Sequence, residues 1–335
     1  MKFYKIPFFF LISIVFLSGC VHKSIYEPAK VEGNVKNISA MKKHLYNVVR
    51  EGAMLTNGNI ITKRSGLVNL EIPKGFSFIN ETENAIIVAN SEGDIKIYSK
   101  PNHKLIFSKK FDNAIVSATL KDNYLAAVLE NNNILLYDIK SDKTLYTEAL
   151  EKVITIDARA ANPLFLNDLI IFPTLDGRLL IMQSDKKVVL RDVAISDKDL
   201  FNNVIFLKVN DNKLVAATAS KVIVITPKNI FNYKASIKDI LYLGHKIYLF
   251  GKNGTVTLLD ESLKKLKQHS FEFANFLAVG AVGDRIYMAE KQGYVISMDK
   301  NLQNIKIQKL DDEIENSVLI AKGILYTDDK AIKLK

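Results

Sequence analysis

The chain has 335 residues, with 46 Lys and Arg against 36 Asp and Glu, and a formal net charge of +10. It contains one cysteine and no tryptophan. A single cysteine excludes an internal disulfide. The lysines are spread along the chain and interleave with acids, without a basic stripe joined to stacking aromatic residues. We therefore expect no nucleic-acid binding.

The first residues have the features of a secretory signal. Lysines precede an apolar run, IPFFFLISIVFL (residues 6–17), that is too short to span a bilayer and is followed by Ser-Gly-Cys20. A small pair before a cysteine resembles the lipobox of bacterial lipoproteins. The resemblance implies removal of residues 1–19 and acylation of Cys20, which would hold the protein on a lipid bilayer. In such lipoproteins an Asp after the cysteine favours the inner membrane. Because Val21 stands there, we expect the periplasmic face of the outer membrane.

A hairpin pattern recurs along the rest of the chain. Each copy is an apolar run, a polar turn that often holds Gly, and a second run of alternating residues. The eight copies are residues 58–71, 84–99, 123–138, 167–182, 212–226, 245–260, 284–299 and 322–335. In an all-β chain, a period near forty residues indicates the blades of a propeller.

Two further strands are expected in each repeat. Outer strands followed by the inner strand of the next blade are predicted at residues 104–111 and 114–122, and again at 144–150 and 152–158. The sequence therefore predicts an all-β fold, an eight-bladed propeller of four-stranded antiparallel blades.

The ends of the chain are expected to close the ring. The last hairpin lacks an outer strand, and an uncovered blade would expose an edge. We therefore expect a segment within residues 29–38 to supply the missing strand, with residues 20–28 as a tether and 29–335 as a single domain. Residues 37–50 fit a short helix or an inner strand equally well.

Two repeats carry a family resemblance. The segments GDIKIYSKPNHKLIFSKKF and NNILLYDIKSDKTLYTEAL resemble PQQ-like repeats, although Phe107 and Tyr146 stand where the family usually has Trp. Quinoprotein dehydrogenases of this class use Trp beneath the cofactor, often a vicinal Cys pair, and a Ca²⁺ site. This chain lacks Trp, and the histidines follow no metal spacing. We expect no enzymatic activity, no cofactor and no metal, and a remnant redox enzyme is the least favoured alternative.

The architecture also resembles the BamB family, the lipid-anchored propellers of the outer-membrane β-barrel assembly (BAM) machinery. Two motifs carry this resemblance. One is ITIDARAANP, with Arg159 and Pro163 one residue closer than in the family, and the other is ISDKD at 195–199. The resemblance implies docking on the POTRA domains of a BamA-like partner through Arg159, Asp197 and Asp199.

Neighbouring apolar residues, Ile156, Leu200 and Phe201, are candidate buried anchors of that interface. The alternative is that Asp197 and Asp199 solvate a turn and that Arg159 pairs with Asp157 or a neighbouring blade. The sequence thus predicts a monomeric scaffold of the barrel-assembly complex. The alternative function is a periplasmic propeller that binds another envelope protein, a peptide or a glycan.

Overall fold

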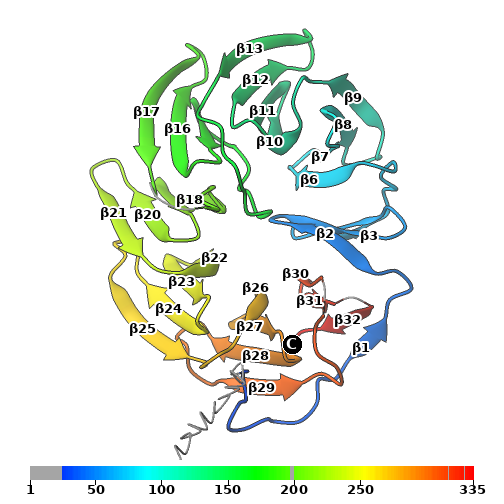
Figure 1. The fold of residues 1–335 in the computed structure, drawn as a ribbon, viewed down its shortest axis with the longest axis vertical. Helices are drawn as coiled ribbons and strands as arrows, with labels where there is room; N and C mark the ends of the chain where they lie inside the picture. Colours follow the sequence, from blue (N-terminus) through cyan, green and yellow to red (C-terminus); the bar gives the residue numbers. More distant parts are fainter. Residues whose placement is uncertain (1–24, 197–199, 316, 328) are drawn as a thin grey trace, which may run out of the picture.

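The structure, a computed structural model, describes residues 25–196, 200–315, 317–327 and 329–335. All the regular elements in this part of the chain are β-strands, and they form eight four-stranded antiparallel sheets arranged in a ring (Figure 1). This confirms the predicted eight-bladed propeller. Among the same residues there is no helix with the length and apolarity needed to cross a bilayer.

The strands follow one another from the inner to the outer edge of each blade. Blade 1 has β2 (Leu45–Val49), β3 (Gly52–Leu55), β4 (Ile60–Thr62) and β5 (Gly66–Val68). Blade 2 has β6 (Ser77–Glu81), β7 (Ala85–Ala89), β8 (Asp94–Ser99) and β9 (Leu105–Lys110). Blade 3 has β10 (Ile115–Lys121), β11 (Tyr124–Leu129), β12 (Ile134–Asp138) and β13 (Lys143–Glu148). Blade 4 has β14 (Leu164–Leu166), β15 (Leu169–Pro173), β16 (Arg178–Gln183) and β17 (Val188–Ala194).

The second half of the ring repeats this order. Blade 5 has β18 (Phe206–Asn210), β19 (Lys213–Ala217), β20 (Lys221–Ile225) and β21 (Ile230–Lys234). Blade 6 has β22 (Ile237–Leu243), β23 (Lys246–Gly251), β24 (Thr255–Leu259) and β25 (Lys265–Ser270). Blade 7 has β26 (Phe276–Val282), β27 (Arg285–Glu290), β28 (Tyr294–Asp299) and β29 (Lys306–Lys309). Blade 8 has β30 (Leu319–Ala321), β31 (Ile324–Tyr326), β32 (Lys330–Lys333) and, outermost, β1 (Ile38–Ala40).

The hydrophobic core lies between neighbouring blades. The second strands are the most buried, and all five residues of β7 are buried, because a neighbouring blade covers each face of the sheet. Outer strands alternate instead, as in β21. Phe107, in the position where the resembling family has Trp, packs on Tyr137 of the next blade at 5.9 Å between ring centres. Aromatic contacts of this kind hold adjacent blades together.

One hairpin was assigned wrongly within its blade. Residues 58–71 hold β4 and β5, the third and fourth strands of blade 1, whereas the other seven hairpins are second and third strands. The equivalent turn in blade 1 contains Asn57 and Gly58, between β3 and β4. The strands of blade 1 are short and follow one another closely, so the wrong pair carried the hairpin signature.

The strand predicted at residues 152–158 is absent. These residues form no strand, and the inner strand of blade 4 is β14. The chain between β13 and β14 runs inward toward the middle of the ring (Figure 1). Within it, the Asp157 amide donates to the Asn203 side chain rather than to a strand ladder. Residues 37–50, in contrast, contain the strands β1 and β2, so the strand alternative is correct there.

The N-terminal segment closes the ring as predicted, but two of the three residues of the closing strand lie beyond the expected range 29–38. β1 pairs antiparallel with β32, and it begins at Ile38, the last residue of the expected range (Figure 1). Upstream, the Val35 amide donates to the Lys309 carbonyl at 2.8 Å, so this segment also runs along β29. Tyr26 is buried against Phe271 and Tyr294, with edge-on ring contacts at 6.2 and 5.5 Å. The packed part of the chain thus starts within the segment expected to be a tether.

The antiparallel order places the connections on two opposite faces. The connection face carries the turns between second and third strands and the links from each blade to the next. The turn face carries the turns between first and second and between third and fourth strands. Residues 149–163 (the β13–β14 connection) and the described residues of the β17–β18 connection, 195–196 and 200–205, lie on the connection face.

Candidate protein-docking surface

The two segments that the sequence marked for docking lie side by side. The Asp157 amide donates to the Asn203 side-chain oxygen at 2.6 Å, and the Asn203 amide group donates back to the Asp157 carbonyl at 3.1 Å. The Ala161 amide also donates to the Val204 carbonyl at 2.8 Å. Because Asn203 is fully buried, this reciprocal pair fixes the β13–β14 connection against the β17–β18 connection.

A second asparagine holds the other end of the β13–β14 connection. Asn132 has a positive φ of 67° in the turn of blade 3 and is fully buried. Its side chain donates to the Glu151 carbonyl at 2.9 Å and accepts from the Leu175 amide at 2.7 Å. Asparagine tolerates the left-handed conformation and supplies both a donor and an acceptor. It therefore joins blades 3 and 4 at the base of the docking segments.

Gly177 sets the geometry of the β17–β18 connection. Its φ is +85°, and a Cβ there would lie 2.7 Å from the Asn202 backbone oxygen. The Ile195 amide donates to the Gly177 carbonyl at 2.9 Å. Only glycine combines this conformation with such a close approach. The turn of blade 4 consequently lies directly against the second docking segment.

Arg159 is paired within the protein. Its Nε donates to Asp157 at 2.9 Å, and its guanidinium also contacts the second carboxylate oxygen. The two side chains are only 23% and 19% exposed. Burial would raise the pKa of Asp157, but the Arg159 charge lowers it overall, and Asp157 in turn raises the pKa of Arg159. The pairing that the sequence left open as an alternative is therefore present.

The apolar side chains of the two connections differ in exposure. Ile156, a predicted anchor, is partly buried against the core between blades 3 and 4. Ile154 is 92% exposed and Leu200 is 70% exposed. Phe201 is 49% exposed and has a positive φ of 62°. Sequence reasoning missed Ile154, because its segment was assigned to the inner strand of the next blade. Asp197 and Asp199 lie outside the described residues.

A cavity of about 550 Å³ lies beside these exposed residues. Its lining includes Ile154, Thr155, Leu200 and Asn202. The Thr155 hydroxyl and the Asn202 side-chain oxygen are buried and have no hydrogen-bond partner among the described residues. We call this cavity and its rim of Ile154, Leu200 and Phe201 the docking surface.

The docking surface lies on the more acidic face. Within the described residues, the acidic side chains of the connection face are Glu71, Glu92, Asp112, Glu130, Glu151, Asp157, Asp176, Glu272, Asp311, Asp312, Glu313, Glu315 and Asp329. Its basic side chains are Lys42, Lys43, Lys74, Lys152, Arg159, Lys252 and Lys291. The chain as a whole is positive, so the basic excess lies elsewhere. The same described residues contain no cluster of three or more His, Cys, Asp or Glu that could hold a metal ion.

Comparison with known proteins gives relatives by sequence. No family model matches the chain. It is 30% identical over 310 residues to plasminogen-binding protein PgbB of Helicobacter pylori strain J99, an alignment that covers 79% of this chain and 57% of PgbB. PgbB of strain 26695 is 30% identical over 301 residues, with 76% and 55% covered. The chain thus spans little more than half the length of the curated relatives it matches.

Comparison with solved structures gives the fold. BamB from Moraxella catarrhalis superposes with a TM-score of 0.68 and 12% identity, over 90% of this chain and 99% of BamB. The C-terminal WD40 domain of Sif2 gives 0.66 and 14%, with the same coverage. At such low identity the likeness extends to the propeller architecture and no further. The chain is therefore BamB-like in fold, whereas its sequence is similar to PgbB.

Proposed function

We propose that this chain is a non-enzymatic, lipid-anchored scaffold of the cell envelope that binds another protein through the docking surface. The observation that carries the proposal is the pair of connections that Asn203 holds together, with exposed apolar side chains at their tips. Large exposed apolar residues on a rigid base beside a cavity are the features of an interface anchor.

The charge of the connection face as a whole favours a basic partner, while the cavity itself is lined by two acids, Glu151 and Asp176, and two bases, Lys152 and Arg178. Acidic residues predominate on the connection face. Acidic groups at the rim of an interface steer a partner that carries Lys or Arg and increase the association rate, and exposed apolar anchors then supply most of the affinity. We therefore expect a partner surface with an apolar hollow bordered by basic residues.

Anchoring would keep the propeller close to the membrane. If Cys20 is acylated, only five residues separate it from Tyr26, which is packed against blades 6 and 7. At about 3.3 Å per residue, this linker reaches at most roughly 20 Å. Tyr26 contacts Phe271, a residue of the connection face. The edge of the docking face would thus lie near the bilayer, at the periplasmic side of the outer membrane, where membrane-bound partners are reached.

The first candidate partner is a BamA-like barrel-inserting protein. Support comes from the lipobox-like sequence, the two docking motifs and the BamB-like fold. The structure brings the two motif-bearing connections together, which is the arrangement that a common docking site requires. In this account the protein holds the barrel-inserting subunit in place while barrel proteins fold and insert.

The second candidate partner is plasminogen. The two relatives found by sequence comparison are plasminogen-binding proteins, and each is 30% identical to this chain over the aligned residues. Such a role would require the propeller to be accessible from outside the cell. Because the chain matches little more than half of these relatives, plasminogen binding could also belong to their remaining part.

Co-purification of the full-length protein tests the docking surface. We expect the double variant Ile154→Asp, Leu200→Asp to lose at least about tenfold of the recovered envelope partner, because charges replace two interface anchors. The matched control is Leu105→Asp, Ile106→Asp on β9, where the side chains are 51% and 50% exposed. Equal recovery with both double variants would contradict the proposed surface.

The identity of the recovered protein distinguishes the two partners. Recovery of the barrel-inserting subunit with the wild type, and its loss with the docking variant, would support the first candidate. Dose-dependent binding of purified plasminogen to the wild type, with no envelope partner recovered, would replace the first candidate with the second. Anchoring is tested by Cys20→Ser, which should move the protein from the membrane fraction to the soluble fraction.

A further inference from the structure

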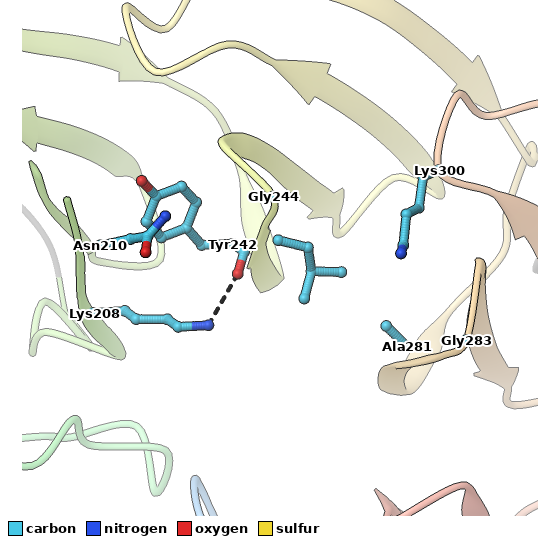
Figure 2. A pocket seen from close by; sticks show the side chains of 8 residues that line it. Lys208, Asn210, Tyr242, Gly244, Ala281, Gly283 and Lys300 are labelled. Carbon is cyan, nitrogen blue, oxygen red and sulfur yellow. Dashed lines mark hydrogen bonds between the residues drawn. The ribbon is translucent and has the colours of Figure 1, made fainter.

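The turn face carries a pocket lined by two lysines. It has a volume of about 300 Å³ and lies between blades 5, 6 and 7 (Figure 2). Besides Lys208 and Lys300, its lining consists of Asn210, Tyr242, Leu243, Gly244, Ala281 and Gly283. None of these lining residues is acidic. We call this site the lysine pocket.

The two ammonium groups reach the lysine pocket from different blades. Lys208 extends from β18 and donates to the Tyr242 carbonyl at 3.0 Å, and Lys300 enters from the far side (Figure 2). Lys300 lies 3.3 Å from Asp284, whose side chain is 99% exposed. Exposed ion pairs of this kind contribute little. Both cations can therefore accept an additional anionic partner.

Another lysine on the same face has a different environment. Lys213 contacts Glu261, whose side chain is only 13% exposed and also accepts from the Tyr242 hydroxyl. That carboxylate is held by several donors and neutralises its lysine within the protein. The lysine pocket, although it also borders Tyr242, contains no equivalent carboxylate.

The lysine pocket continues into the mouth of the central channel. A cavity of about 630 Å³ there shares Lys208, Tyr242 and Leu243 with it. This cavity adds three cations without an ion pair in the described part of the chain, Lys63, Arg64 and Lys121, and two similarly unpaired carboxylates, Glu51 and Glu83. Burial lowers the pKa of Lys63 and the neighbouring Arg50 charge lowers it further, while Asp239 and Glu51 offset part of this effect. An anion placed here would relieve that repulsion.

We propose that the lysine pocket binds the carboxylate side chains of an acidic, partly apolar peptide segment from a partner protein. Lysine ammonium groups act as point charges that accept carboxylates in many orientations. Leu243 and Ala281 offer an apolar wall between the two cations. The continuation into the channel mouth extends the site in one direction, which suits an extended chain better than a compact ion. The lysine pocket shares no lining residue with the docking surface.

The probe for this proposal is a fluorescently labelled peptide of alternating Glu and Leu, measured by anisotropy with the full chain at low salt. We expect Lys208→Gln combined with Lys300→Gln to weaken binding at least tenfold. The matched control is Lys186→Gln combined with Lys187→Gln in the turn between β16 and β17, which removes the same charge from the same face. An equal loss in both double variants would indicate general charge attraction and overturn the proposal.

A second pair of variants fills the pocket without removing a lysine. Ala281 is exposed and borders the pocket, so a longer side chain is accommodated there (Figure 2). Ala281→Glu places a carboxylate between the two ammonium groups and should abolish peptide binding, whereas Ala281→Gln has the same size and should weaken it less than threefold. Thermal unfolding checks that both variants are folded. Equal binding by the two variants would contradict a carboxylate site.

Inorganic phosphate separates a peptide site from a simple oxyanion site. We expect phosphate to displace the peptide only to the extent that sodium chloride of equal ionic strength does, because salt screens both equally. Full displacement by phosphate at concentrations where sodium chloride has no effect would assign the pocket to a small oxyanion instead. A wild-type protein that binds no peptide at low salt would also overturn the proposal.

Discussion

The two faces of the ring differ in how their connections are built. On the turn face, strands are joined by short turns such as the two residues between β22 and β23, because adjacent strands of one hairpin must pair in register. On the connection face, the links between blades vary in length from two residues, between β21 and β22, to the β13–β14 connection. The variable face holds the exposed apolar residues of the docking surface, and the regular face holds the lysine pocket.

The two faces of the ring also differ in charge. Acidic side chains outnumber basic ones on the connection face, whereas the two kinds are nearly balanced on the turn face. A ring of blades fixes where each connection emerges but leaves its composition free. The connection face can therefore attract a basic partner, whereas on the turn face the lysine pocket is a local site for an acidic one.

The largest effect on stability should come from the ion pair that joins two blades across the central channel of the ring. Arg50 of blade 1 and Asp239 of blade 6 lie 2.5 Å apart with side chains 8% and 15% exposed. Asp239→Ala leaves the Arg50 charge buried and unpaired, which should lower the free energy of unfolding by about 3–5 kcal/mol. Chemical denaturation at pH 7 measures this loss. A difference below 1 kcal/mol would mean that the channel does not hold the ring together.

The same pair predicts a pH dependence. Burial would raise the pKa of Asp239, but the Arg50, Lys63 and Arg159 charges lower it below its ordinary value. A depressed carboxyl pKa contributes stability above about pH 4, and this contribution is lost as the pH falls through the folded-state pKa. The difference between wild type and Asp239→Ala should therefore shrink below about pH 4. A difference that grows on acidification would contradict this assignment.

Matched glycine substitutions compare the packing of the two faces. Gly254, on the connection face, has a φ of +78°, and a Cβ there would lie 2.0 Å from the Phe271 carbonyl oxygen. Gly283, on the turn face, has a φ of +57° and nothing within 4 Å of such a Cβ. We expect Gly254→Ala to cost about 2–4 kcal/mol and Gly283→Ala about 1 kcal/mol. Equal losses of unfolding free energy would show that only the backbone conformation matters.

Asn203→Ala should have a smaller effect on stability but a clear effect on docking. The variant loses two hydrogen bonds that join the docking connections and leaves a buried cavity, at a cost of about 1–3 kcal/mol. Partner recovery should fall although Ile154 and Leu200 are retained, because their positions are no longer fixed. Asn304→Ala, which removes an exposed hydrogen bond to Asp299 on the turn face, is the control and should leave recovery unchanged.

The sequence predicted the ring because each blade repeats a local pattern. Alternating apolar residues and turn glycines are read directly from neighbouring residues, and the closing strand followed from an unpaired edge. The β13–β14 connection could not be predicted in this way. Its apolar residues look like a strand, but the decisive contacts come from Asn132 and Asn203, which are distant in sequence. A tertiary hydrogen bond outweighed local β propensity there.

The candidate site was predictable only in part. Leu200 was expected as an anchor from its motif and is exposed beside the cavity. Ile154 and Ile156 have the same side chain and nearly the same surroundings in sequence. One is 92% exposed, and the other is partly buried because it packs against the core between blades 3 and 4. The lysine pocket was not predicted, since its two lysines come from blades far apart in the chain.

Photo-crosslinking in living cells tests the docking surface most directly. A photoreactive amino acid at position 154 should form a crosslink to one envelope protein, whereas the same amino acid at position 106 on the outer edge of blade 2 should not. The crosslink at position 154 should also disappear in the Asn203→Ala background. No crosslink at 154, or the same products at 154 and 106, would contradict the account that this face binds the partner.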